Sequence, residues 1–220
     1  MKAHTAELFE PASATQPRRE ALHEGAVLLR GFALSHERAI LSALDGVIRV
    51  APLRHMSTPG GLRMSVAMSN CGSFGWISDR RGYRYSPDDP ETGTAWPPMP
   101  HIFAQLAREA AASAGFADFV PDACLINRYE PGAKLSLHQD RDEKDFSQPI
   151  VSVSLGLPAS FLFGGFARSD HPLRIPLAHG DIVVWGGASR LRYHGVLPLK
   201  DGTHPLLGAC RTNLTFRKAM

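Results

Sequence analysis

The stretch LSLHQDRDE, residues 135–143, begins with alternating apolar and polar residues. One imidazole and two carboxylates then follow at every second position. Strand side chains repeat every second residue, so His138, Asp140 and Asp142 are expected on one face. A second histidine, His194, lies in the later stretch RLRYHGV. Two imidazoles and one carboxylate leave open positions on an octahedral metal, which is typical of Fe(II) sites that must also bind a cosubstrate and dioxygen. The pattern predicts an iron site.

The choice of the second histidine depends on its surroundings, because the chain has ten histidines and an HxD pair alone is a weak signal. His179 lies in AHGD, which is typical of a turn, and we interpret it as structural. His204 precedes a proline in a loop-like segment. His194 is preferred because it lies within an apolar strand pattern.

A second set of polar residues strengthens the metal hypothesis. The stretch RTNLTFR places four of them on one strand face, namely Arg211, Asn213, Thr215 and Arg217. Buried guanidinium groups need an anion, and arginine binds carboxylates through two parallel hydrogen bonds. In INRY, Asn127 and Tyr129 add neutral donors. The alternative is an edge strand with solvated arginines. An iron site beside a dicarboxylate pocket indicates 2-oxoglutarate, with Arg217 holding its far carboxylate.

The bulk composition is that of an ordinary globular protein. Hydrophobic residues make up 44% of the 220 residues, charged residues 20%, and the formal net charge is +3. This charge is compatible with a polyanionic partner but does not establish one. Three widely separated cysteines fit neither a zinc ribbon nor a disulfide framework. There is no apolar leader and no membrane-spanning run, so we expect a cytoplasmic protein without a membrane partner.

The elements that position these residues fall into two halves. We expect a loose arm over residues 1–20, a strand over 25–32, a helix over 35–48 with Ser35 as its N-cap, and a helix over 101–115 ending at Gly115. Residues 54–100 are irregular and rich in aromatic residues. Short strands separated by turns follow: ACLINRY, KLSLHQD, IVSVSLGL, SFLFGG, LRIPLA, DIVVWGG, LRYHGV and TNLTFR. Eight strands without intervening helices predict a mainly β fold, a jelly roll with flanking helices.

Several long stretches resemble the AlkB family of Fe(II)/2-oxoglutarate-dependent dioxygenases. They are TPGGLRMSVAMSNCGSFGW, RRGYRYSPDDP, PDACLINRYEPGAKLSLHQDRDE, PIVSVSLGLPASFLFGG, HGDIVVWGG and RTNLTFR. The resemblance implies one dioxygenase domain over residues 21–220, with a nucleotide-recognition lid at about 54–100 and a double-stranded β-helix core at about 122–218. It also implies oxidative demethylation of 1-methyladenine and 3-methylcytosine in DNA, preferentially single-stranded, and in RNA. Fe(II), 2-oxoglutarate and O₂ are used, and succinate, CO₂ and formaldehyde are released. We expect a monomer.

The resemblance also implies residue roles. The catalytic iron ligands are His138, Asp140 and His194. The 2-oxoglutarate residues are Asn127, Tyr129, Arg211, Asn213 and Arg217. The substrate residues are Trp76 and Tyr83 in the lid and Asp142 and Arg168 at the base. Arg141 is a small departure, because we expect lysine there in the best-known member of the family.

The substrate roles have a physical basis. A base must leave its stack to reach the metal, and Trp76 and His138 offer flat partners for it. Asp142 can accept a hydrogen bond from an exocyclic amine. Candidates for contact with backbone phosphates are Tyr83, Lys134 and Arg141.

Other functions stay open from the residues alone. A cupin-like metal enzyme without 2-oxoglutarate explains the HxD and His194 but leaves Arg211 and Arg217 without an anion. A jelly-roll binding module with a structural metal requires a closed ligand set, and only three ligands are convincing. The same chemistry could also act mainly on RNA or on a methylated protein side chain.

Overall fold

The computed structural model describes residues 18–220, so the predicted arm lies outside the described residues up to position 17. The arm prediction is wrong for residues 18–20, because these begin strand β1, Arg18–His23. This strand pairs in antiparallel fashion with β2, Ala26–Arg30, which lies within the predicted strand over 25–32.

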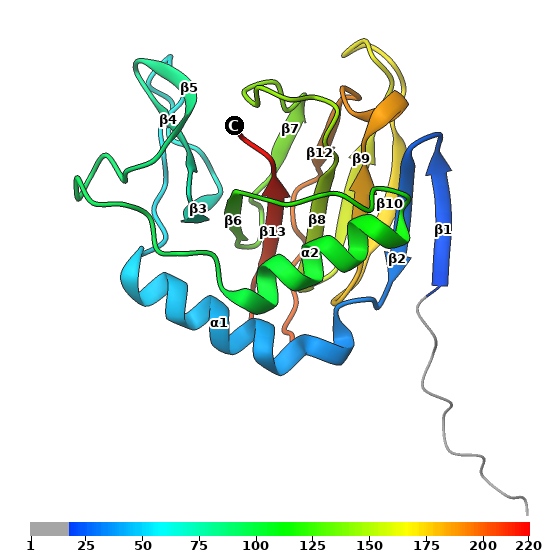
Figure 1. The fold of residues 1–220 in the computed structure, drawn as a ribbon, viewed down its shortest axis with the longest axis horizontal. Coiled ribbons are helices and arrows are strands. Elements are labelled where there is room, and N and C mark those ends of the chain that lie inside the picture. The colour runs from blue at the N-terminus through cyan, green and yellow to red at the C-terminus, as the bar shows by residue number, and fades with distance from the viewer. Residues whose placement is uncertain (1–17) are drawn as a thin grey trace, which may run out of the picture.

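Seven strands form the large sheet, in the order β1-β2-β11-β8-β13-β6-β3. Its remaining members are β11 (Ile182–Trp185), β8 (Ile150–Gly156), β13 (Arg211–Arg217), β6 (Ala123–Tyr129) and β3 (Ala67–Gly72). The central strands β8 and β13 are buried along their whole length. Figure 1 shows this sheet running through the middle of the molecule.

A second sheet of four strands packs against the first. Its order is β10-β9-β12-β7, with bounds Leu173–Leu177, Ala159–Phe163, His194–Val196 and Leu135–His138. Apolar side chains from both sheets, including Phe161, Phe163 and Trp185, form the core between them. Two antiparallel sheets closed over one core confirm the predicted jelly roll.

Both helices cover the other face of the large sheet, as Figure 1 shows. Helix α1, Glu37–Val50, buries Ile40, Leu44 and Val47, which recur at helical spacing. Helix α2 (His101–Ser113) buries five apolar residues and ends two residues before Gly115, close to the predicted end. Gly115 has a φ of +100°, which favours glycine.

The predicted N-cap of α1 is wrong. Ser35 lies inside a short 3₁₀ turn, Leu34–His36, and the N-cap is His36 without a side-chain capping bond.

The lid hairpin consists of β4, Gly75–Asp79, and β5, Gly82–Ser86, and it forms a sheet of its own beside β3 (Figure 1). Not all of residues 54–100 belongs to it, because β3 pairs with β6 in the large sheet. The hairpin starts at a crowded point, because a Cβ on Gly75 would clash with the ring of Trp96. The side chain of Asn70 exchanges two 3.0 Å hydrogen bonds with the backbone of Trp76 and ties β4 to β3.

Two further observations concern the described chain. None of its helices combines the length and the apolar character needed to cross a membrane. The three cysteines are all buried and unbridged.

Candidate active site

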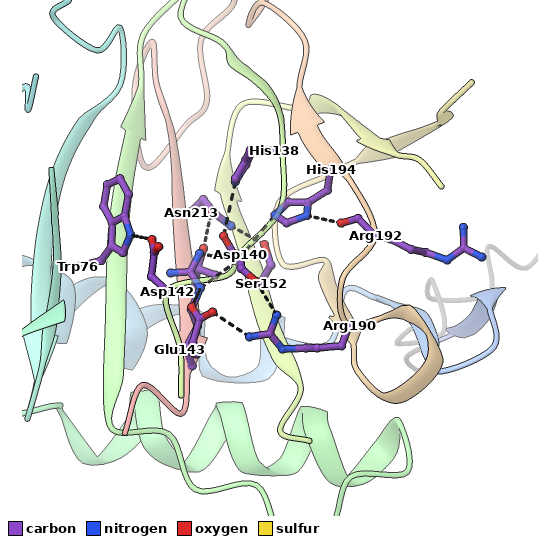
Figure 2. A network of polar contacts seen from close by, with 12 residues as sticks. Trp76, His138, Asp140, Asp142, Glu143, Ser152, Arg190, Arg192, His194 and Asn213 are labelled. Carbon is purple, nitrogen blue, oxygen red and sulfur yellow. Dashed lines mark hydrogen bonds and ion pairs between the residues drawn. The ribbon is translucent and has the colours of Figure 1, made fainter. Parts of the chain in front are cut away.

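The two histidines of the predicted iron site lie directly opposite each other in the small sheet. His138 ends β7 and pairs in register with His194, the first residue of β12. Their ring centroids are 4.4 Å apart. The carboxylate of Asp140 lies 3.6 Å from Nε2 of His138 and 3.7 Å from Nε2 of His194. One ligand atom from each residue lies within 4.8 Å of the others, which fits a single metal ion (Figure 2).

Both imidazoles are oriented for metal binding. Nδ1 of His138 is 2.9 Å from the carbonyl oxygen of Ser136, and Nδ1 of His194 is 3.1 Å from that of Arg192. When Nδ1 donates to a carbonyl, the lone pair of Nε2 is free for a metal. Burial, together with the charge of His138, lowers the pKa of His194 to about 3, which keeps this ring neutral.

The carboxylate of Asp140 reaches the histidines from a loop. We expected one strand face to continue from His138 to Asp142, but β7 ends at His138. Residues 139–142 are not part of a strand, and the side-chain amide of Gln139 donates to the carbonyl of Leu191. In this loop Asp140 and Asp142 face different partners.

Arg217 is the closest cationic partner of Asp140, donating to its Oδ2 at 2.7 and 2.9 Å. Burial raises the pKa of the Asp140 carboxyl, but the positive charge of Arg217, together with smaller electrostatic contributions from the two imidazoles, outweighs burial and holds the pKa well below its usual range. The site therefore presents an anionic oxygen ligand between two nitrogen ligands.

The predicted 2-oxoglutarate residues are brought together by strand register. Across β13 and β6, Arg211 pairs with Tyr129 and Asn213 pairs with Asn127. All four side chains are buried. They face the core between the sheets, whereas the alternate residue Leu214 packs toward the helices. The alternation read from the sequence is thus confirmed.

Arg211 is the deepest charge of this wall, with 1% of its surface exposed. Its Nε donates to Ser154 at 3.0 Å and its guanidinium lies 4.9 Å from the ring centre of Tyr129. Its Nη1 is buried and has no hydrogen-bond partner among the described residues. A buried guanidinium with a free donor fits a ligand carboxylate.

Asn213 is held rigidly by its neighbours. Its Nδ2 donates to Ser152 and to the carbonyl of Val153, both at 2.8 Å, and its Oδ1 accepts from Thr215 at 2.8 Å. The serines at alternate positions of β8, Ser152 and Ser154, belong to this wall. The sequence carried a signal for them, because they are polar residues at every second position of the apolar run IVSVSLGL.

The lid supplies the opposite wall. Nε1 of Trp76 donates to Oδ2 of Asp142 at 2.7 Å, as Figure 2 shows. The ring of Tyr83 stacks on Trp76 with centroids 5.5 Å apart and an interplanar angle of 13°. The structure therefore brings Trp76, Tyr83 and Asp142 together.

The remaining candidates lie at the rim. Arg168 is exposed in the β9–β10 loop, with its guanidinium 5.7 Å from the ring centre of Tyr193. Lys134 and Arg141 are also exposed. His179 is structural, as interpreted: it accepts from the N–H of Gly156 at 2.8 Å and lies 2.7 Å from a carboxylate oxygen of Glu37.

Sequence reasoning missed a buried charge cluster next to the iron ligands. Glu143 and Arg190 form an ion pair at 3.0 Å with almost no exposed surface. The hydroxyl of Tyr85 donates to Glu143 at 2.7 Å, and Nε of Arg217 lies 3.3 Å from a carboxylate oxygen of Glu143. Glu143 belongs to the charged run DRDEKD, which is typical of solvated surface. The signal for its buried position was that it follows the HxD motif closely in the sequence.

Comparisons with known proteins agree with this geometry. The family model of the 2OG-Fe(II) oxygenase superfamily matches residues 25–217. The chain is 58% identical over 204 residues to "Alpha-ketoglutarate-dependent dioxygenase AlkB" of Escherichia coli (strain K12), covering 93% of this chain and 94% of that protein. It is 43% identical to the AlkB homolog of Caulobacter vibrioides (strain NA1000 / CB15N), covering 84% and 83%.

A solved structure supports the fold independently. "The structure of OsALKBH1" superposes with a TM-score of 0.78 at 30% identity, covering 91% of this chain and 100% of that one. Both the extent of these matches and the site geometry lead to one assignment. The chain belongs to the AlkB family of Fe(II)- and 2-oxoglutarate-dependent dioxygenases.

Proposed function

We propose that this protein oxidatively demethylates N-alkylated nucleic acid bases, 1-methyladenine and 3-methylcytosine above all, in DNA and preferentially in single strands. The observation that carries this proposal is the pairing of a three-ligand metal site with a flat aromatic lid whose indole N–H rests on Asp142. Flat rings and a carboxylate suit a cationic base that carries an exocyclic amine.

The cofactor residues follow from the contacts. His138, Asp140 and His194 would hold Fe(II), which together with 2-oxoglutarate and O₂ supplies the oxidising chemistry. Arg211, with its buried free donor beside Tyr129, is the better candidate for the far carboxylate of 2-oxoglutarate. Arg217, which we had expected in that role, lies beside Asp140 and would orient the end of the cosubstrate nearest the metal.

The protein's own groups handle the substrate. Trp76 would stack on the flipped base, and the Asp142 carboxylate would accept from its amine and favour its positive charge. Arg168 would contact the base from the rim. Tyr83, which is 47% exposed, would face the phosphate backbone with Lys134. One chain supplies all these groups, which supports a monomeric enzyme. We also place it in the cytoplasm.

RNA is the second candidate substrate, because a site that reads a single flipped base makes the same stacking and amine contacts to either polymer. A cupin-like metal protein without 2-oxoglutarate is disfavoured by Arg211, whose buried charge has no acidic partner among the described residues.

The test is a direct assay. Purified protein is incubated with Fe(II), 2-oxoglutarate, ascorbate and a single-stranded DNA oligonucleotide containing 1-methyladenine, and demethylation is followed by mass spectrometry and by formaldehyde release. Matched RNA and duplex substrates rank the polymers. We expect turnover to be fastest on single-stranded DNA. Absence of demethylation, with a control enzyme active, would refute the proposal, and faster turnover of RNA would reassign the substrate.

A further inference from the structure

Two neighbouring carboxylates after the iron ligands hold two directly paired residues of the lid. Asp142 accepts from the indole of Trp76 and Glu143 accepts from the hydroxyl of Tyr85, both at 2.7 Å. Trp76 and Tyr85 face each other in register across β4 and β5. Both strands of the lid hairpin are therefore hydrogen-bonded at the same level, β4 to Asp142 and β5 to Glu143.

The two contacts differ in their surroundings. The bond between Tyr85 and Glu143 is buried, whereas the bond between Trp76 and Asp142 is open to solvent. A buried hydrogen bond to a charged group is costly to break, because the carboxylate cannot turn to water instead. A solvent-exposed bond exchanges easily with another donor. The Glu143 contact is thus suited to a fixed anchor and the Asp142 contact to a replaceable one.

Glu143, the proposed anchor, is also connected to the iron site by two arginines. Arg190 binds Glu143 at 3.0 Å and donates from Nη1 to the backbone carbonyl of Asp140 at 3.0 Å, as Figure 2 shows in part. Arg217, which binds the Asp140 carboxylate, lies 3.3 Å from Glu143. Glu143 and Asp140 therefore both contact Nε of Arg217, so Glu143 helps to hold the guanidinium that binds Asp140.

We propose that Glu143 is a positioning residue that couples the lid to the iron site, and that the Trp76–Asp142 hydrogen bond is the contact that a substrate base takes over. An indole N–H is the same kind of donor as an exocyclic amine, so the lid occupies the acceptor that the base needs. This second part rests on the proposed function; the anchoring by Glu143 does not.

Anchoring is tested without substrate, by hydrogen–deuterium exchange of the full chain. Tyr85→Phe removes one hydroxyl and keeps the ring, so we expect the amides of residues 75–86 to exchange about tenfold faster or more, the size of a hydrogen bond to a charged group. Exchange in helix α2 is the internal control and should not change. Unchanged exchange in the hairpin would overturn the anchor.

The link to the iron site is tested by 2-oxoglutarate binding in the presence of Mn(II), measured by calorimetry. Glu143→Gln should both loosen the hairpin and weaken 2-oxoglutarate binding about tenfold, since Arg217 loses a charged partner. Asp145→Asn, an exposed acid two residues along the same loop, is the matched control and should change neither. Loosening of the hairpin with unchanged 2-oxoglutarate affinity would overturn the coupling.

Replacement of the Trp76 N–H by the base at Asp142 is tested with two oligonucleotides that differ in one base. 3-Methylcytosine carries an exocyclic amine, and 3-methylthymine carries a carbonyl instead. Trp76→Phe weakens stacking on both but removes the competing N–H, so the preference for 3-methylcytosine in anaerobic binding should rise about threefold to tenfold. An unchanged or smaller preference for 3-methylcytosine would overturn the proposal that the base replaces the Trp76 N–H at Asp142. If neither oligonucleotide binds to the unsubstituted protein, the proposed function fails while the exchange result on Tyr85 stands.

Discussion

Arg217 donates two hydrogen bonds to a single carboxylate oxygen of Asp140, at 2.9 Å from Nε and at 2.7 Å from Nη2. The same carboxylate lies within 3.7 Å of both imidazoles of the metal site. A predicted cosubstrate residue and a predicted metal ligand thus share one buried contact. We therefore expect metal binding and 2-oxoglutarate binding to affect each other through Arg217, because a cation and the guanidinium would share the carboxylate of Asp140.

Asp140→Asn should abolish metal binding and turnover. The amide keeps the size of the carboxylate but loses the charge that a divalent cation needs, and even outer-shell changes at metal sites cost about 10- to 100-fold in affinity. Mn(II) calorimetry and the demethylation assay measure the two losses. Asp142→Asn is the matched substitution on the same loop and should retain Mn(II) affinity. Equal Mn(II) affinity in both variants would exclude Asp140 as a ligand.

Arg211→Lys should raise the KM for 2-oxoglutarate about tenfold or more with a smaller change in kcat. Lysine keeps the charge but cannot present two parallel N–H groups to a carboxylate, and each tenfold corresponds to about 1.4 kcal/mol. Steady-state kinetics at varied 2-oxoglutarate measures the split. Arg174→Lys, on the exposed part of β10, is the control. An unchanged KM would instead assign the binding of the far carboxylate of 2-oxoglutarate to Arg217.

Asp142→Ala should chiefly impair substrate selection. Loss of its acceptor removes the favourable contact with an exocyclic amine, which is worth about a factor of ten for a hydrogen bond to a charged group. We expect kcat/KM to fall for 3-methylcytosine and to change little for 3-methylthymine, while Mn(II) binding persists. A similar fall for both bases would show that Asp142 acts on lid structure and not on the base.

Lys134→Ala should reduce the salt dependence of single-strand binding. Each phosphate neutralised on a single strand contributes about −0.7 to the slope of log affinity against log salt concentration. Fluorescence anisotropy of an unmethylated oligonucleotide over a range of salt concentrations measures the slope. Arg108→Ala, exposed on α2, removes a charge from the helical face and serves as the control. Equal slopes for the two variants would place Lys134 outside the nucleic acid path.

Much of the core could be predicted because strand periodicity is a local property. ACLINRY corresponds to β6 without error, and TNLTFR misses one residue of β13. The alternation also separated Arg211 and Asn213 from Leu214, since a strand between two apolar layers must send its polar residues to one side. The three metal ligands followed from residue type and context.

The failures of prediction have both local and remote causes. Strand β1 pairs with the adjacent β2 across a short turn, and the 3₁₀ turn at Ser35 is closed by local backbone hydrogen bonds. After β7 ends at His138, by contrast, Gln139 bonds to the remote Leu191. Residues 54–100 looked irregular because their strands are short. β3 pairs with the remote β6, whereas β4 and β5 pair with each other.

The jelly roll, the HxD and His194 ligand set, and the face that carries Arg211 could be predicted from the sequence, because they follow from residue type and a spacing of two along the chain. The tertiary structure alone decided that Glu143 is buried and that Arg217 binds Asp140. Burial and charge pairing depend on groups that arrive from remote segments: Tyr85 lies 58 positions before Glu143, and Arg217 lies 77 positions after Asp140. A carboxylate in a charged run becomes a buried anchor only when such partners satisfy it.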